Sequence, residues 1–513
     1  MILLADYERK LVIPRWLNYA KASKTRELSY PKATPFVLNK FTQRRLVTEY
    51  LDFKNAPTPH KAADLMGAAF VIGDESIAIE LAQYIKKSSG LNKPIHNLAS
   101  HILGEAPYAG PSLTIREKIA QSKQFLAEFP NNALGWIERA RFYTIAGQVL
   151  KADKCVQIAL NLAPSDRFVV RSAARFFLHS DKIDDAWTCV KHASDIHFDP
   201  WIKATEISIA QVIKKNVKKL KGLVPTSGTP DNIFHHSELI ESYGMLELIN
   251  GNDHRAKKFF KLAWSNPSHN VVTHSEWIVR AHFPAMIDMA EKNFGESIEA
   301  VAWRNFHQAK IDEALTAAVE WGLEEPYARN AFSLGSCLAF QKHNYDFGIK
   351  IVKRGLEANP NDFGLQNNVC FGLLKMNKVT DAENVFLKIA PPVESASKVV
   401  YLATKGLLEY KKGQPGPGRN LYLKAIGEAQ EFGNKSLLAN ALLNFAIAEI
   451  ESNTVEAKEY ASVALSFSEK IVDGFVVMSR QLLHESLAGL NKNNERLPFG
   501  EFHNPKIVEL PNG

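Results

Sequence analysis

The chain has 513 residues, of which 46% are hydrophobic, and its 62 basic and 55 acidic residues give a formal net charge of +7. This length allows several globular domains or one repeat array of about a dozen units, and the hydrophobic content is ordinary for a folded soluble protein. The small basic excess is spread over a large surface. It does not by itself indicate a nucleic-acid partner, because a dedicated binder usually concentrates its charge on one face.

Two features of the sequence indicate the cellular compartment of the protein. Residues 1–10 lack the apolar core of a signal peptide, and no apolar run is long enough to span a bilayer. Two of the cysteines lie 34 residues apart, at equivalent repeat positions where adjacent helices are roughly 8–10 Å apart, too far for a disulfide without movement. We therefore expect reduced thiols, a cytoplasmic location and no membrane insertion. The four cysteines are Cys155, Cys189, Cys337 and Cys370.

The first 132 residues do not show a regular repeat. In residues 1–55, Pro14, Pro31 and Pro35 interrupt any long helix, and we expect an irregular helical cap there. Residues 56–132 read as degenerate helical repeats. A helix is expected to begin at Thr58-Pro59, where an N-cap oxygen is followed by proline in the first turn.

A 34-residue period begins at residue 133. The first unit carries large, small, aromatic, small, large, small and proline positions in a fixed order, and the second repeats all but the proline. These positions are Trp136, Ala140, Tyr143, Ala152, Val156, Ala159 and Pro164, followed by Val170, Ala174, Phe177, Ala186, Val190 and Ala193. Small residues at Ala140 and Ala152 allow two antiparallel helices to approach closely, and Trp136 and Tyr143 are expected to be buried between neighbouring pairs.

This period and order resemble the tetratricopeptide repeat. The resemblance implies an all-α fold, a right-handed superhelical solenoid of helix pairs with atypical capping ends. It also implies a protein that binds other chains rather than an enzyme.

The remaining chain follows the repeat less regularly. Residues 133–236 contain the two best repeats and a basic joint, with a Pro- and Gly-bearing loop at 225–230 that predicts a softer boundary between two halves. Residues 237–470 predict a C-terminal array of similar helix pairs, and 471–513 a capping helix and a tail.

Catalytic motifs are absent from the sequence. There is no phosphate-binding loop of the Gly-x-x-x-x-Gly-Lys type, no His-Glu-x-x-His and no Gly-x-Ser-x-Gly. His269, His274 and His282 do not share one helical face, so they are interpreted as surface or cap histidines rather than metal ligands. We predict a protein without enzymatic activity, cofactor or metal.

Three arginines form the first candidate site. In the tetratricopeptide family the first helix of each pair lines the concave surface, which implies that Arg141, Arg171 and Arg175 face a water-filled groove. Three guanidinium groups suit a carboxylate or phosphate ligand, so this interpretation predicts a partner with an acidic segment. The alternative is that they pair with Glu138, Asp184 or Asp185, or stay solvated. As groove residues, Arg171 and Arg175 should tolerate replacement by glutamate without loss of the fold.

A second candidate site lies on the inner face of the later repeats. Asn367, Phe371 and Tyr410 would give an apolar groove with a polar amide, which suits an amphipathic helix or an extended peptide. The alternative is that tight superhelical winding buries these side chains.

A stripe of lysines supports an alternative function, the binding of nucleic acid. It consists of Lys214, Lys215, Lys218, Lys219 and Lys221. No aromatic residues interleave with these lysines, so a solvated face competes with an anion or nucleic-acid contact. The sequence therefore favours a non-catalytic adaptor, scaffold or sensing subunit that binds a protein or peptide in its groove. The alternative function is a nucleic-acid-binding regulator that uses the lysines and a basic groove.

Overall fold

The computed structural model describes residues 11–17, 40–72, 74–89, 91, 93–105, 113–193, 199–215, 230–393 and 395–493. Within these ranges the chain forms α-helices and two short 3-10 helices, with no β-strand, which confirms the predicted all-α class. The chain divides into two compact units: unit 2 comprises Tyr7–Ser297, and unit 1 comprises Ile298–Gly513 with Met1–Asp6. Each unit is described by itself.

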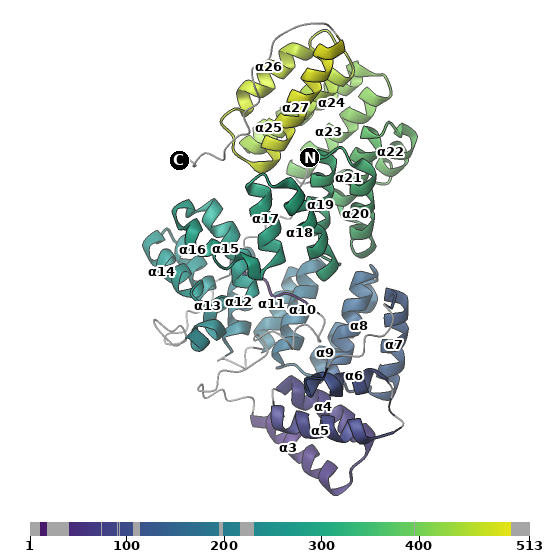
Figure 1. The fold of residues 1–513 in the computed structure, drawn as a ribbon, viewed down its shortest axis with the longest axis vertical. Helices are drawn as coiled ribbons and strands as arrows, with labels where there is room; N and C mark the ends of the chain where they lie inside the picture. Colours follow the sequence, from purple (N-terminus) through teal and green to yellow (C-terminus); the bar gives the residue numbers. More distant parts are fainter. Residues whose placement is uncertain are drawn as a thin grey trace. The chain divides into compact units, whose positions relative to one another are not determined.

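Unit 2 contains the helices drawn from purple to teal in Figure 1. They are α3 (Lys40–Asn55), α4 (Pro59–Ile72), α5 (Glu75–Lys87), α6 (Lys93–Ile102), α7 (Ile115–Glu128), α8 (Ala133–Ile145), α9 (Val149–Leu162), α10 (Arg167–His179), α11 (Ile183–His192), α12 (Pro200–Val212), α13 (Pro230–Ile249), α14 (Asp253–Ala263), α15 (His269–Ala281), η3 (Pro284–Met286), α16 (Ile287–Glu291) and η4 (Phe294–Glu296).

Unit 1 continues in the green to yellow helices of Figure 1. They are α17 (Ile298–His307), α18 (Ile311–Glu324), α19 (Arg329–Gln341), α20 (Tyr345–Ala358), α21 (Phe363–Lys375), α22 (Val379–Phe386), α23 (Ser395–Lys411), α24 (Pro415–Phe432), α25 (Lys435–Glu451), α26 (Ala457–Ser468) and α27 (Gly474–Asn493).

Both units are stacks of helix pairs. Most helices pack on the next in the chain, as α8 on α9, α10 on α11 and α19 on α20. The first helices of successive pairs also pack on one another. In unit 2, α8 packs on α10; in unit 1, α19 packs on α21, and α21 packs on α23. Contacts restricted to near neighbours are the arrangement of a helical repeat array.

The two predicted pairs at 133–164 and 167–199 are present as α8 with α9 and α10 with α11. Ala140 and Ala152 have no exposed surface, and Tyr143 is buried, as the close-packing interpretation requires. The prediction for Trp136 is wrong. Trp136 is only half-buried. Its indole N–H donates to the carbonyl of Pro130 at 2.7 Å, and its ring lies beside the Arg139 guanidinium. The fully buried neighbour is Ile137.

A close approach joins α23 and α24. A Cβ atom on Gly418 would lie 2.6 Å from a ring carbon of Tyr410, so only glycine fits there. Helix α24 begins at Pro415. Proline is well suited to the first helical turn because it lacks the N–H that would have no partner there. The turn itself is made by Gly413, whose φ is +78°.

The cysteines are free thiols. Cys155, Cys337 and Cys370 are buried and Cys189 is half-buried, and burial raises the pKa of Cys189, Cys337 and Cys370 to about 12. These three side chains therefore carry protonated, weakly nucleophilic thiols at neutral pH. Among the described residues, no helix combines the length and apolar character needed to cross a bilayer.

The predicted joint falls partly outside the described residues, since 216–229 are not among them. The helices before and after it, α12 and α13, pack on each other within unit 2. The division between compact units lies at Ser297 and Ile298 instead. A softer boundary within 201–236 stays a prediction.

The first testable prediction concerns the α8–α9 crossing. Replacing the fully buried Ala152 by leucine should overpack it and lower the free energy of unfolding by about 1–3 kcal/mol, measured by urea denaturation. Leu150→Ala is the matched control on the same helix. Leu150 is 78% exposed, so its loss should change stability by less than about 0.5 kcal/mol. Equal stability of Ala152→Leu and the parent would contradict the close crossing.

Candidate functional site

The three arginines singled out from the sequence lie on α8 and α10 of unit 2. Arg141 is 7% exposed, and Arg171 and Arg175 are each 6% exposed, so the expectation of a water-filled groove around them is corrected. The reason is that every residue of α10 is buried, since this helix packs on α8, α9, α11 and α12. Their role in partner binding stays a prediction.

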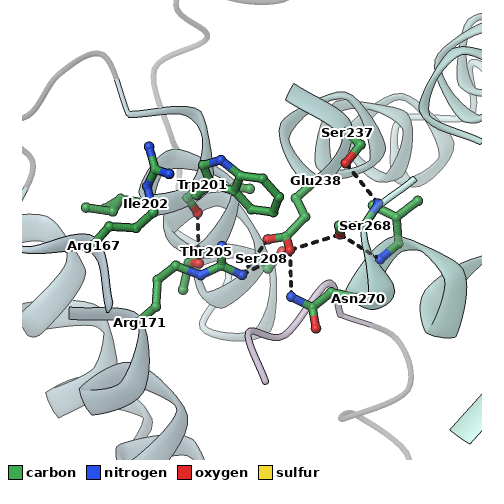
Figure 2. A network of polar contacts seen from close by, with 12 residues as sticks. Arg167, Arg171, Trp201, Ile202, Thr205, Ser208, Ser237, Glu238, Ser268 and Asn270 are labelled. Carbon is green, nitrogen blue, oxygen red and sulfur yellow. Dashed lines mark hydrogen bonds and ion pairs between the residues drawn. The ribbon is translucent and has the colours of Figure 1, made fainter. Parts of the chain in front are cut away.

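Arg171 forms the centre of a buried polar network (Figure 2). Its Nη2 donates to both carboxylate oxygens of Glu238, at 3.0 and 2.9 Å, and Glu238 itself is 1% exposed. Glu238 Oε1 also accepts from the side-chain amide of Asn270 at 2.6 Å and from the hydroxyl of Ser268 at 3.1 Å. The Arg171 guanidinium lies 4.9 Å from the ring centroid of Trp201, which adds a cation–π contact.

This network joins α10, α12, α13 and the start of α15. A buried ion pair is tolerated only when further hydrogen bonds satisfy its remaining donors and acceptors. Glu238 meets that condition through three donor residues. The sequence named Glu138, Asp184 and Asp185 as possible partners, because they are close along the chain. The observed partner is 67 positions away from Arg171.

The same helices form two further buried pairs of charged or polar side chains. Arg167 Nε donates to Asp199 Oδ2 at 2.7 Å, and Asp199 Oδ1 also accepts from the backbone N–H of Trp201 at the start of α12. Glu241 and His274 lie 2.8 Å apart, Oε1 to Nδ1, and neither side chain has exposed surface. Burial raises the pKa of Glu241, and the bond from His274 opposes that rise. His274 is therefore a core residue, not the surface or cap histidine that the sequence predicted.

Arg141 contacts a segment that sequence reasoning did not place. Its Nε donates to the carbonyl of Trp16 at 3.1 Å, and Trp16 has no exposed surface. Residues 11–17 contain no helix or strand, and the irregular helical cap expected over residues 1–55 stays a prediction. Their burial against α8 was not predicted, because nothing in the local pattern indicates which helices a non-repetitive segment contacts.

The second candidate set lies in unit 1. Asn367 on α21 has no exposed surface, and neither its side-chain oxygen nor its nitrogen has a hydrogen-bond partner. Ser333, at the equivalent position 34 residues earlier on α19, is 4% exposed, and its hydroxyl also has no partner. Buried polar groups normally find partners, so two such groups in the same register of neighbouring repeats require an explanation.

The two aromatic residues of this set differ in their surroundings. Phe371 is half-buried, and its ring packs on that of Phe340 with the centroids 5.7 Å apart. Tyr410 is buried and donates its hydroxyl to Glu449 at 2.5 Å, a carboxylate that Arg419 also binds. Burial and this carboxylate raise the pKa of Tyr410. Tyr410 is therefore committed within the fold, as the winding alternative predicted, and Phe371 remains partly accessible.

The lysine stripe is only partly within the described residues. Lys214 and Lys215 are exposed at the end of α12, and the Lys215 ammonium lies 5.4 Å from the centroid of the Trp187 ring. Lys218, Lys219 and Lys221 lie outside the described ranges. No group of side chains suited to a metal ion occurs in the part of the chain that the structure describes.

The fold can be identified from these observations. The 34-residue period falls on stacked helix pairs, with the predicted alanines fully buried at the α8–α9 and α10–α11 crossings. The chain has a tetratricopeptide-like fold.

Comparison with known proteins adds no function to this fold. No protein-family profile and no curated protein sequence matches the chain. It is similar to the crystal structure of the APC/C hetero-tetramer Cut9-Hcn1, at 13% identity and a TM-score of 0.40 over 88% of both chains. It is also similar to yeast Tom70, at 12% identity and a TM-score of 0.29 over 93% of this chain and 97% of the other. A third similarity is to the human IFIT1 dimer with PPP-AAAA, at 14% identity and a TM-score of 0.31, over 85% of this chain and 96% of the other.

The buried ion pair generates the second prediction. Arg171→Met or Glu238→Gln leaves one group buried without its charge partner, which should lower the free energy of unfolding by about 3–5 kcal/mol. Arg171→Glu should destabilise unit 2 as well, contrary to the expectation from sequence. The double variant Arg171→Met/Glu238→Leu should lose much less than the sum of the two single losses.

Lys182→Met provides a matched control, since Lys182 forms a 2.6 Å ion pair with Asp153 in the same unit but is 36% exposed. It should change stability by about 1 kcal/mol or less. Strictly additive losses in the Arg171 and Glu238 variants, measured by urea denaturation, would show that the pair is not coupled.

Proposed function

We propose that this chain is a non-catalytic adaptor that binds an extended segment of another protein on the inner face of α19 and α21. The observation that carries the proposal is the side-chain amide of Asn367, which is buried and has no hydrogen-bond partner. An unpaired buried polar group costs about 1–3 kcal/mol. A side chain that destabilises the free protein in this way is typical of a functional position, because selection for stability alone would replace it.

The chemistry of Asn367 matches a peptide main chain. Its amide offers one acceptor oxygen and two donor hydrogens, so it can bind a peptide N–H and a peptide C=O together. Ser333 offers a hydroxyl at the same register on α19. Packed helices are about 8–10 Å apart and an extended strand rises about 3.3 Å per residue, so the two groups would meet main-chain groups about three residues apart.

Apolar residues lie further along α21 and α19 from Asn367. Phe371 is four residues further along α21, and Phe340 and Leu374 are buried near the same end of the pair. This combination favours a partner segment with apolar side chains and an extended main chain. Because Asn367 and Ser333 are buried in the free chain, binding must be coupled to a small opening of this face.

An acidic partner is now less well supported than the sequence suggested. Arg171 is neutralised by Glu238 and Arg167 by Asp199, so these charges are already matched inside unit 2. The nucleic-acid alternative depended on the basic groove predicted from Arg141, Arg171 and Arg175 and on a lysine stripe, of which only Lys214 and Lys215 are described. No described contact favours it over the peptide.

The third prediction tests the amide directly. Extended peptides selected from a display library against the intact parent chain should bind Asn367→Leu about tenfold or more weakly, a loss of about 1.4 kcal/mol. The same variant should be as stable as the parent or more stable, because leucine has a similar volume and no unpaired polar group. Fluorescence anisotropy and urea denaturation measure the two effects.

Gln366→Leu is the control on the same helix. Gln366 donates to the carbonyl of Pro360 and should not contact the peptide, so its loss should leave peptide affinity unchanged. A destabilised Asn367→Leu that binds the peptides like the parent would mean that the amide has a structural role, and the proposed face would be wrong.

A further inference from the structure

We propose that residues 11–17 are an intramolecular ligand of unit 2, and that a peptide of the same chemistry from another protein can replace them. The segment reads Leu-Val-Ile-Pro-Arg-Trp-Leu. This second site lies in a different unit from the face around Asn367 and does not depend on it. The competing peptide is therefore extended and apolar, with an aromatic anchor and an adjacent basic residue.

The contacts of the segment are those of a bound peptide. Trp16 has no exposed surface, and its ring meets that of Phe176 on α10 edge to face, with the centroids 6.1 Å apart. The main-chain carbonyl of Trp16 accepts from Arg141 on α8. One residue earlier, Arg15 Nη1 lies 3.4 Å from His269 Nδ1 at the start of α15. Three different helices thus contact the segment: α10 packs on its aromatic side chain, α8 binds its main chain, and α15 makes a polar contact with Arg15.

The aliphatic residues of the segment add to the anchor. Val12 is 1% exposed, and Leu11 and Leu17 are also buried, whereas Ile13 and Arg15 are half-buried. Burial concentrated on one aromatic residue with aliphatic neighbours is the pattern of a peptide hot spot. The trace of the segment is visible in purple below the polar network in Figure 2.

The segment is separate from the repeat packing that it contacts. It has no regular secondary structure, and residues 18–39 lie between it and α3. The helix pairs beside it are closed by their own residues, such as Ala140 with Ala152 and Ala174 with Ala186, all without exposed surface. The Arg171–Glu238 network fixes α10, α13 and α15 from within. The receiving surface is therefore preformed by contacts that do not include residues 11–17, which lowers the cost of binding a peptide there.

Residues 11–17 are covalently attached to unit 2, which explains how they can fill the site and still be replaced by another peptide. A tethered ligand experiences an effective concentration in the millimolar range, so even a modest intrinsic affinity keeps it bound. A competing peptide must overcome that concentration. Weakening the tethered copy should therefore strengthen binding of an added copy, an outcome that an integral part of the core would not give.

The test uses the full-length chain and a fluorescein-labelled peptide of residues 11–17. The parent should bind the peptide weakly, and full-length Trp16→Ala should bind it about tenfold or more tightly, because its own segment no longer competes. Trp16→Phe should fall between them. A peptide carrying Trp16→Ala should not bind either protein, and adding Arg141→Gln to the Trp16→Ala chain should weaken binding of the unmodified peptide.

Circular dichroism and thermal unfolding accompany the binding measurement. The proposal requires that Trp16→Ala keep its helical content and cooperative unfolding. A Trp16→Ala chain that loses either, or that binds the peptide no better than the parent, would overturn the proposal and make the segment part of the core. A concentration-dependent dimer of the parent would also overturn it, since the occupant would then come from a second copy. Asn367→Leu should leave this binding unchanged, which separates the result from the test of the proposed function.

Discussion

The organisation of unit 2 depends on one buried ion pair, Arg171 with Glu238. Two charges can be removed from water only if their attraction and additional hydrogen bonds offset the loss of hydration. Asn270 and Ser268 complete the carboxylate's partners, and the Trp201 ring covers the guanidinium. The pair therefore fixes how α10, α12, α13 and α15 lie together, which the near-neighbour contacts of a helical repeat do not specify alone.

That constraint changes where binding can occur. Of the arginines predicted to bind an acidic ligand, Arg171 is matched by Glu238 within the fold, and the neighbouring Arg167 on α10 is matched by Asp199. Unit 1 contains buried polar groups of another kind that have no hydrogen-bond partner. They include the amide of Asn367 and the hydroxyl of Ser333. In unit 2, Trp16 contacts Arg141 on α8 and Phe176 on α10. In both proposals the partner would be recognised through its main chain and its apolar side chains rather than through charge.

The sequence predicted those features that depend on residues close together in the chain. Helix pairs, their period and the buried Ala140 and Ala152 follow from local packing rules, and they are present as predicted. The selection of Asn367 as a partner-binding residue stays a prediction. The sequence could not predict the partner of Arg171, because a contact over 67 positions leaves no trace in a 34-residue pattern. The half-burial of Trp136 and the burial of Trp16 depend on which surfaces meet in three dimensions, and periodicity carries no information about that.

The central claim is that a partner binds the inner face of the repeats in unit 1. Site-specific photo-crosslinking from the full-length chain in its native cell tests it most directly. A photoreactive phenylalanine analogue at Phe371, half-buried on α21, is compared with one at Phe347, which is 38% exposed on the neighbouring α20. The account predicts that the analogue at 371 crosslinks to one defined, extended segment of a partner, identified by mass spectrometry, and that the analogue at 347 does not. Equal capture of the same segment from both positions, or capture from 347 alone, would contradict it.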